Sequence, residues 1–77
     1  MISEQLKKVI LRQLKLDDYA LLEGMTAGEV PGWDSLSHVS IIFAVEAEFG
    51  IEFSTLEIIR LKTIGDLQAL VNRKKRP

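Results

Sequence analysis

The chain has 77 residues, of which 47% are hydrophobic and 27% charged, and this predicts a single globular domain over residues 1–77 rather than a disordered segment. It contains no cysteine and only one histidine, which excludes disulfides, thiolate metal sites and a histidine metal cluster. The net charge of −1 is segregated along the chain: residues 1–16 carry +3, residues 17–66 carry −8 and residues 67–77 carry +4.

This charge pattern bears on the partners and the location that we expect. The acidic middle of the chain favours a basic partner surface. The basic run from Arg73 to Arg76 is typical of a helix end that complements the helix dipole, so no nucleic-acid partner is expected. No run approaches the ~18 apolar residues of a membrane span, and the start at Met1 lacks a signal peptide. We therefore expect a cytoplasmic monomer that does not insert into membranes.

The first predicted element is an amphipathic helix over about residues 3–15, with Ser3 as its cap. A long connection follows from Asp17 to Trp33. A loop of this length in a compact domain needs anchors. The expected anchors are its larger apolar residues, Leu21, Leu22, Met25 and Val30.

The second predicted helix, over about residues 35–49, has two apolar faces rather than one. The face expected to meet the core comprises His38, Ile41, Ile42, Val45 and Phe49. The other face comprises Leu36, Val39, Phe43 and Ala47, which we expect to be free to meet a partner. Gly50 is placed to end this helix.

A short third helix is expected from Ser54 or Thr55 through about Leu61, and Thr63 can cap a fourth. The predicted core residues after the second helix are Ile51, Phe53, Ile64, Leu67, Leu70 and Val71. No segment alternates as a strand would. The sequence therefore predicts an all-α fold, a small four-helix bundle of three longer helices and one short helix, with a long loop between helices 1 and 2.

The segment Gly32–Val39 is the candidate functional site, because a loop turns into a helix there. Asp34 can act as the N-cap of the second helix, and Ser35 then occupies the first helical position with an exposed hydroxyl. A phosphate esterified to that hydroxyl would lie beside the positive end of the helix dipole.

Three motifs resemble those of acyl carrier proteins: Gly32-x-Asp34-Ser35-Leu36, Glu46 to Phe53, and Thr63 to Leu67. The resemblance covers essentially the whole chain and implies a carrier, not an enzyme. It implies that Ser35 carries 4′-phosphopantetheine, donated by coenzyme A through a phosphopantetheinyl transferase. The arm's thiol would hold acyl groups as thioesters for loading and processing enzymes.

The second apolar face of the helix over about residues 35–49, together with the acidic middle of the chain, predicts the docking surface for those enzymes. Its expected residues are Leu36, Val39, Phe43 and Glu46. Ser37 and Ser40 stand where many fatty-acid carriers have acids, which favours a free-standing carrier dedicated to one pathway of fatty-acid, polyketide or related biosynthesis. The alternatives are a peptidyl or aminoacyl carrier, although those usually have histidine where this chain has Asp34, and an unmodified helical adaptor.

Two residues beside Ser35 admit more than one interpretation. His38 suggests a Ser-His nucleophilic dyad, but 77 residues leave little room for an orienting acid, an oxyanion hole and a pocket. We expect instead that His38 lies at the core-side edge of the helix and packs against the loop. Trp33 is expected to cover the edge of the core, with a contact to a partner or to the arm as the alternative.

Overall fold

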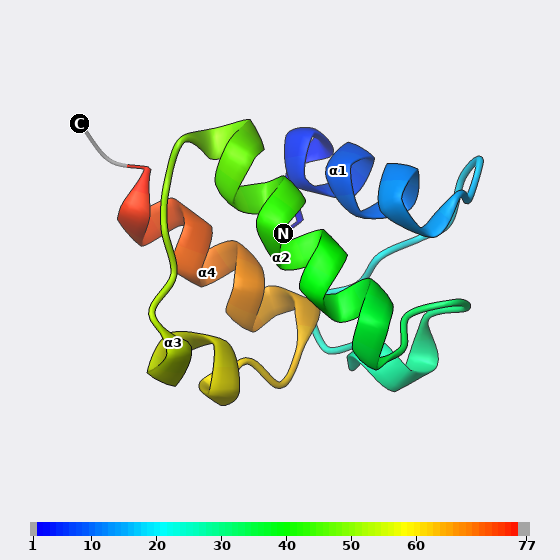
Figure 1. Ribbon diagram of the computed structural model, residues 1–77. Helices are drawn as coiled ribbons and strands as arrows, with labels where there is room; N and C mark the ends of the chain where they lie inside the picture. Colours follow the sequence, from blue (N-terminus) through cyan, green and yellow to red (C-terminus); the bar gives the residue numbers. More distant parts are fainter. Residues whose placement is uncertain (1, 76–77) are drawn as a thin grey trace.

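The computed structural model describes residues 2–75, so Met1, Arg76 and Pro77 lie outside the described residues. The described part is all-helical, as predicted (Figure 1). Its elements in chain order are α1 (Glu4–Leu14), the 3-10 helix η1 (Ala27–Glu29), α2 (Ser35–Phe49), α3 (Thr55–Arg60) and α4 (Ile64–Lys74). Between residues 2 and 75 the backbone forms no strand, only an isolated bridge between Thr26 and Thr63.

Each α-helix begins at a short polar side chain that accepts a hydrogen bond from a free N–H group of the first turn. The caps are Ser3 for α1, Asp34 for α2, Ser54 for α3 and Thr63 for α4. The limits of α2 match the prediction, and Gly50 ends it. α1 stops at Leu14 because Lys15 adopts a left-handed conformation with φ of 58°.

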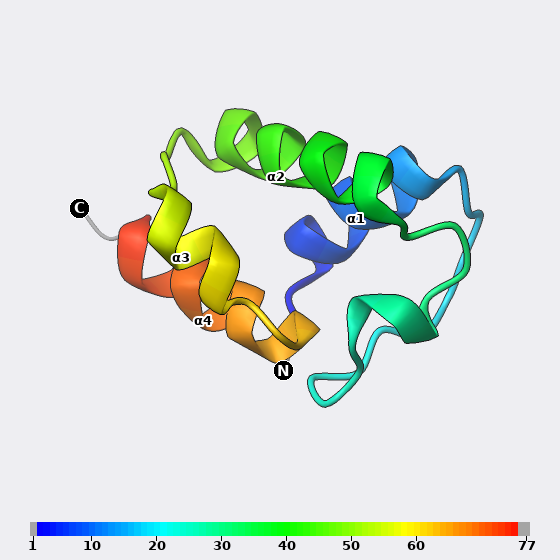
Figure 2. The same ribbon diagram turned by 60° about the horizontal axis from the view of Figure 1, so that its bottom comes forward.

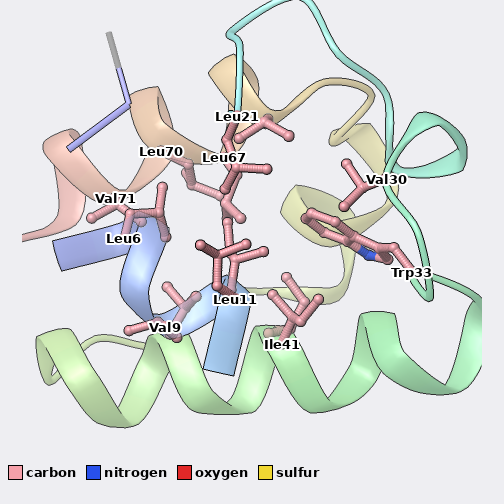
Figure 3. Close-up of a cluster of buried hydrophobic side chains, with 14 of the residues drawn as sticks. Leu6, Val9, Leu11, Leu21, Val30, Trp33, Ile41, Leu67, Leu70 and Val71 are labelled. Carbon is pink, nitrogen blue, oxygen red and sulfur yellow. The ribbon is translucent and has the colours of Figure 1, made fainter. Parts of the chain in front are cut away.

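The core lies where α1 and α4 meet the inner face of α2. α1 packs along α2, and Figure 2 shows α4 and α3 on one side of this pair, with the loop that contains η1 at the Ser35 end of α2. Figure 3 shows the side chains from all three long helices in one cluster. The fully buried large side chains are Leu6, Ile10, Ile41, Val45, Ile64, Leu67 and Val71.

The long loop is anchored by its backbone as well as by side chains. Leu21 and Val30 are buried and Met25 packs against the core, as predicted. The prediction for Leu22 was wrong: its side chain is 63% exposed, because the neighbouring Leu21 already points into the core. The N–H groups of Ile64 and Gly65 donate to the carbonyls of Met25 and Glu23, both at 2.9 Å, and hold the loop on the start of α4.

Candidate functional site

The site begins with a turn that delivers the chain into α2. Gly32 has φ of 81°, a left-handed conformation that glycine adopts without a steric penalty. Asp34 follows in an extended conformation, and its Oδ1 accepts a hydrogen bond from the Ser37 N–H at 2.9 Å. That hydrogen bond lowers the pKa of the Asp34 carboxyl. Asp34 is therefore the N-cap, as predicted, and its charge is directed at the backbone of the first turn.

Ser35 occupies the first position of α2, and its side chain is exposed. Within residues 2–75 its hydroxyl makes no hydrogen bond. It lines an open, mostly apolar hollow together with Ala27, Trp33, Asp34 and His38. A hydroxyl in this position is accessible to an enzyme that esterifies it, and the hollow beside it has room for the attached group. The chemistry of these residues thus fits a phosphodiester-linked arm.

The other serines differ from Ser35 in their surroundings. Ser3 and Ser54 use their hydroxyls as caps, accepting from the N–H groups of Leu6 and Glu57 at 3.2 Å each. Ser37 and Ser40 lie inside α2: the Ser37 N–H is already bonded to the capping Asp34, and Ser40 lies beyond the first turn. Ser35 alone among the described serines combines an exposed side chain and a hydroxyl free of hydrogen bonds with the first position of a helix.

Trp33 and His38 form a hydrogen-bonded pair next to Ser35. The Trp33 ring is only 8% exposed and lies beside Val30 at the edge of the core cluster (Figure 3), which confirms its predicted covering role. Its Nε1–H donates to His38 Nδ1 at 3.1 Å. His38 is half-buried and packs against the loop, as expected.

This pair bears directly on the dyad hypothesis. In a Ser-His dyad one imidazole nitrogen accepts the serine proton, and the N–H of the other nitrogen donates to an orienting acid. Here the partner of His38 is an indole N–H, which can only donate. The described chain therefore supplies His38 with a tryptophan where a hydrolase needs a carboxylate.

The two faces of α2 have opposite exposures. Ile41 and Val45 are fully buried, whereas Leu36, Val39 and Phe43 are 82%, 51% and 65% exposed. The sequence reasoning missed two more exposed apolar residues, Leu56 and Ile59 of α3, at 59% and 69%. Their presence in a six-residue helix, too short to bury several apolar side chains, was the signal that could have identified them.

Glu46, an expected docking residue, also makes a contact within the bundle. It is half-buried, and its Oε2 accepts a hydrogen bond from the Phe53 N–H at 2.7 Å. Glu46 thus ties α2 to the segment that leads into α3. This contact gives Glu46 a structural role, and its role in docking stays a prediction.

A second hollow lies between α3 and α4 and is lined mainly by charged side chains, among them Glu57, Arg60 and Arg73. Its lining residues are remote from Ser35 in sequence, and the described ones differ from those of the hollow beside Ser35.

Among residues 2–75, no helix has both the length and the apolar character required to cross a membrane.

Known proteins resemble this chain over most of its length, although no family model matches it. An acyl carrier protein of Thermosynechococcus vestitus is 34% identical over 73 residues, which cover 95% of this chain and 90% of the relative. An acyl carrier protein of Sinorhizobium fredii is 31% identical over 72 residues, which cover 94% of this chain and 92% of the relative. The solution structure of a holo acyl carrier protein from Geobacter metallireducens superposes with a TM-score of 0.84 at 33% identity, covering 90% of this chain and 79% of that one.

Proposed function

The chain belongs to the acyl carrier protein family, and from this premise we propose that Ser35 carries a 4′-phosphopantetheine arm donated by coenzyme A. When bound, the arm supplies a terminal thiol that holds acyl groups as thioesters. The chain has no cysteine of its own, so this thiol would be the only one in the molecule. Residues 1–77 then act as one carrier domain in the cytoplasm, a monomer that delivers intermediates to other enzymes.

The observation that carries the proposal is the exposed, unbonded hydroxyl of Ser35 at the start of a 15-residue helix. The positive end of the helix dipole favours a phosphate at this position. Asp34 does not oppose it fully, because its carboxylate is held on the Ser37 N–H. The solved relative is a holo acyl carrier protein, which supports the same cofactor for this chain.

We further propose that partner enzymes dock on the outer face of α2. Leu36, Val39 and Phe43 extend this exposed apolar face from Ser35 along the helix, and apolar side chains of this kind form the anchors of interfaces. Glu46 and the loop acids contribute the negative field that attracts a basic partner surface. The partners are a phosphopantetheinyl transferase and acyl-loading and acyl-processing enzymes.

The chemistry of this chain favours delivery over catalysis. The one histidine accepts a hydrogen bond from a tryptophan and not from a group that could orient it as a catalytic base. The protein alone should therefore hydrolyse esters and thioesters no faster than buffer does. Ser37 and Ser40 instead of acids after the motif favour a dedicated pathway of fatty-acid, polyketide or related biosynthesis. An aminoacyl carrier and an unmodified adaptor are the competing functions.

Intact-mass measurement tests the proposal. After incubation with coenzyme A and a phosphopantetheinyl transferase, the protein should gain the mass of one phosphopantetheine. Ser35→Ala should gain none, whereas Ser37→Ala, the matched control two residues away, should be modified normally. Modification that persists in Ser35→Ala would overturn the site, and an unmodified wild-type protein would favour the adaptor.

A further inference from the structure

We propose that His38 binds the phosphodiester at the root of the arm, presenting an Nε2–H whose tautomer is fixed by Trp33. This inference rests on the proposed function of Ser35. It assigns His38 and Trp33 a binding role that the hydroxyl and the helix start alone do not supply.

The first support is the placement of His38 relative to Ser35. The two residues are three positions apart in α2, a spacing that puts side chains on the same side of a helix. Both line the same open hollow, with Trp33 and Ala27 as the apolar part of its wall. An arm attached to the Ser35 hydroxyl therefore starts in the hollow that His38 lines.

The second support is the hydrogen bond from Trp33 to His38. An indole Nε1–H is a donor without acceptor capacity, so His38 Nδ1 must accept, and the proton of the neutral ring then resides on Nε2. Trp33 is 8% exposed, so its ring is held by the core rather than by solvent. Within residues 2–75 no hydrogen-bond partner occupies His38 Nε2. The imidazole is left with a donor that has no partner among the described residues.

The third support is the balance of charge around the hollow. A phosphodiester adds a negative charge beside the carboxylate of Asp34, and Glu29 lines a neighbouring hollow that shares Trp33 and Asp34 with this one. Both carboxylates are engaged with backbone N–H groups, Asp34 with Ser37 and Glu29 with Thr26. Among the residues that the structure describes, no lysine or arginine lines the hollow. His38, through its Nε2–H, is the lining side chain that can donate to the phosphate.

Phosphorus NMR of the holo protein tests this inference directly. A phosphodiester has no ionisation of its own near neutral pH, so its ³¹P resonance reports neighbouring groups that gain or lose a proton. We expect the ³¹P shift of the wild-type holo protein to show an inflection with pH, because protonation of an imidazole that contacts the phosphate changes the shielding of the phosphorus. In His38→Gln, which keeps a polar side chain of similar size, that inflection should be lost.

The controls separate this inference from the proposal for Ser35. Mass spectrometry first verifies that each variant carries one arm, and absence of modification overturns the proposed function itself. With the arm attached, a flat wild-type profile, or an inflection that survives in His38→Gln, overturns the role of His38. If the N-terminal amine caused the inflection, the inflection would survive in His38→Gln, because that variant retains the amine.

The tautomer is tested separately by ¹⁵N NMR of the His38 ring. At a pH where the ring is neutral, the wild-type protein should show a proton on Nε2 alone. Trp33→Phe keeps an aromatic ring over the core but removes the indole donor, so both tautomers should then be populated. A proton on Nδ1 in the wild-type protein, or an unchanged single tautomer in Trp33→Phe, would overturn the role of Trp33.

Discussion

Glu46 Oε2 lies 2.7 Å from the backbone nitrogen of Phe53 and accepts its hydrogen bond, so an acid near the end of α2 holds the chain that leads into α3. Phe53 is itself buried at the edge of the core. The contact links a side chain expected to face partners with the packing of the bundle.

Glu46→Ala should therefore destabilise the fold. Removing the acceptor leaves the partly buried Phe53 N–H without its partner, at a cost of about 1–2 kcal/mol. Glu48→Ala is the matched control, because Glu48 is exposed and, among residues 2–75, accepts a hydrogen bond only from the exposed side chain of Gln5, so the change in stability should stay within about 0.5 kcal/mol. Urea unfolding of both variants checks this, and equal losses would show that the contact to Phe53 is not what stabilises the connection.

The contact between Gly65 and the loop gives a second prediction. A Cβ on Gly65 would lie 2.9 Å from the Glu23 carbonyl oxygen, an atom of the backbone that cannot move without displacing the loop. Gly65→Ala should thus destabilise the protein by about 1–3 kcal/mol. Gly24→Ala, in the same loop with open space around it, should leave stability unchanged or raise it slightly. Thermal melting compares the two, and an unaffected Gly65→Ala would contradict the close approach.

The helices were predictable because their signals are local. Asp34 and Gly50 mark the ends of α2, and the spacing of Ile41 and Val45 identifies its inner face. The packing of the loop was harder to predict, since Leu21 and Leu22 are equally apolar and only the path of the chain decides which one is buried.

Polar contacts between distant segments were also beyond prediction from the sequence. Gln68 is buried, and its Oε1 is satisfied by a hydrogen bond from the Ser3 N–H at 2.8 Å, a contact between residues 65 positions apart. The hydrogen bonds donated by Phe53 N–H to Glu46 and by Trp33 Nε1–H to His38 join residues closer in sequence, yet each depends on a rotamer that helical periodicity does not specify. The backbone conformation of the site could be predicted from the sequence, but the hydrogen-bond partners of its side chains could not.

The pH dependence of stability should reflect Asp66, the acid in the first turn of α4 that completes the capping box with Thr63. Asp66 Oδ2 accepts from the Lys62 and Thr63 N–H groups at 3.1 Å each, and these bonds hold the pKa of Asp66 below the ordinary aspartate value of about 3.9. Because the folded-state pKa is depressed, the stability from this carboxylate is present above the ordinary value and is lost as pH falls through the folded-state value.

The urea midpoint of the wild-type protein should accordingly fall as the pH is lowered from 6 to about 3. Asp66→Asn keeps an oxygen acceptor but cannot titrate, so its midpoint should depend less on pH over the same range. Asp17→Asn, a change at an exposed loop acid, serves as the control and should retain the wild-type slope. A slope that Asp66→Asn leaves unaltered would place the acid sensitivity elsewhere, for example at Glu57, whose pKa is also lowered, by the Ser54 N–H.

The two faces of α2 predict opposite effects for two nearby substitutions. Phe43 is 65% exposed, so Phe43→Ala should change the free energy of unfolding by no more than about 0.5 kcal/mol. On the proposed docking face, however, it removes an anchor, and binding to the transferase or a loading enzyme should weaken by about 1–3 kcal/mol. Val45 is fully buried, so Val45→Ala should cost about 2 kcal/mol of stability by leaving a cavity, with little effect on binding by the folded protein. Urea unfolding and modification rates at several enzyme concentrations measure both properties, and a Phe43→Ala variant that is modified as efficiently as the wild type would remove this face from the docking surface.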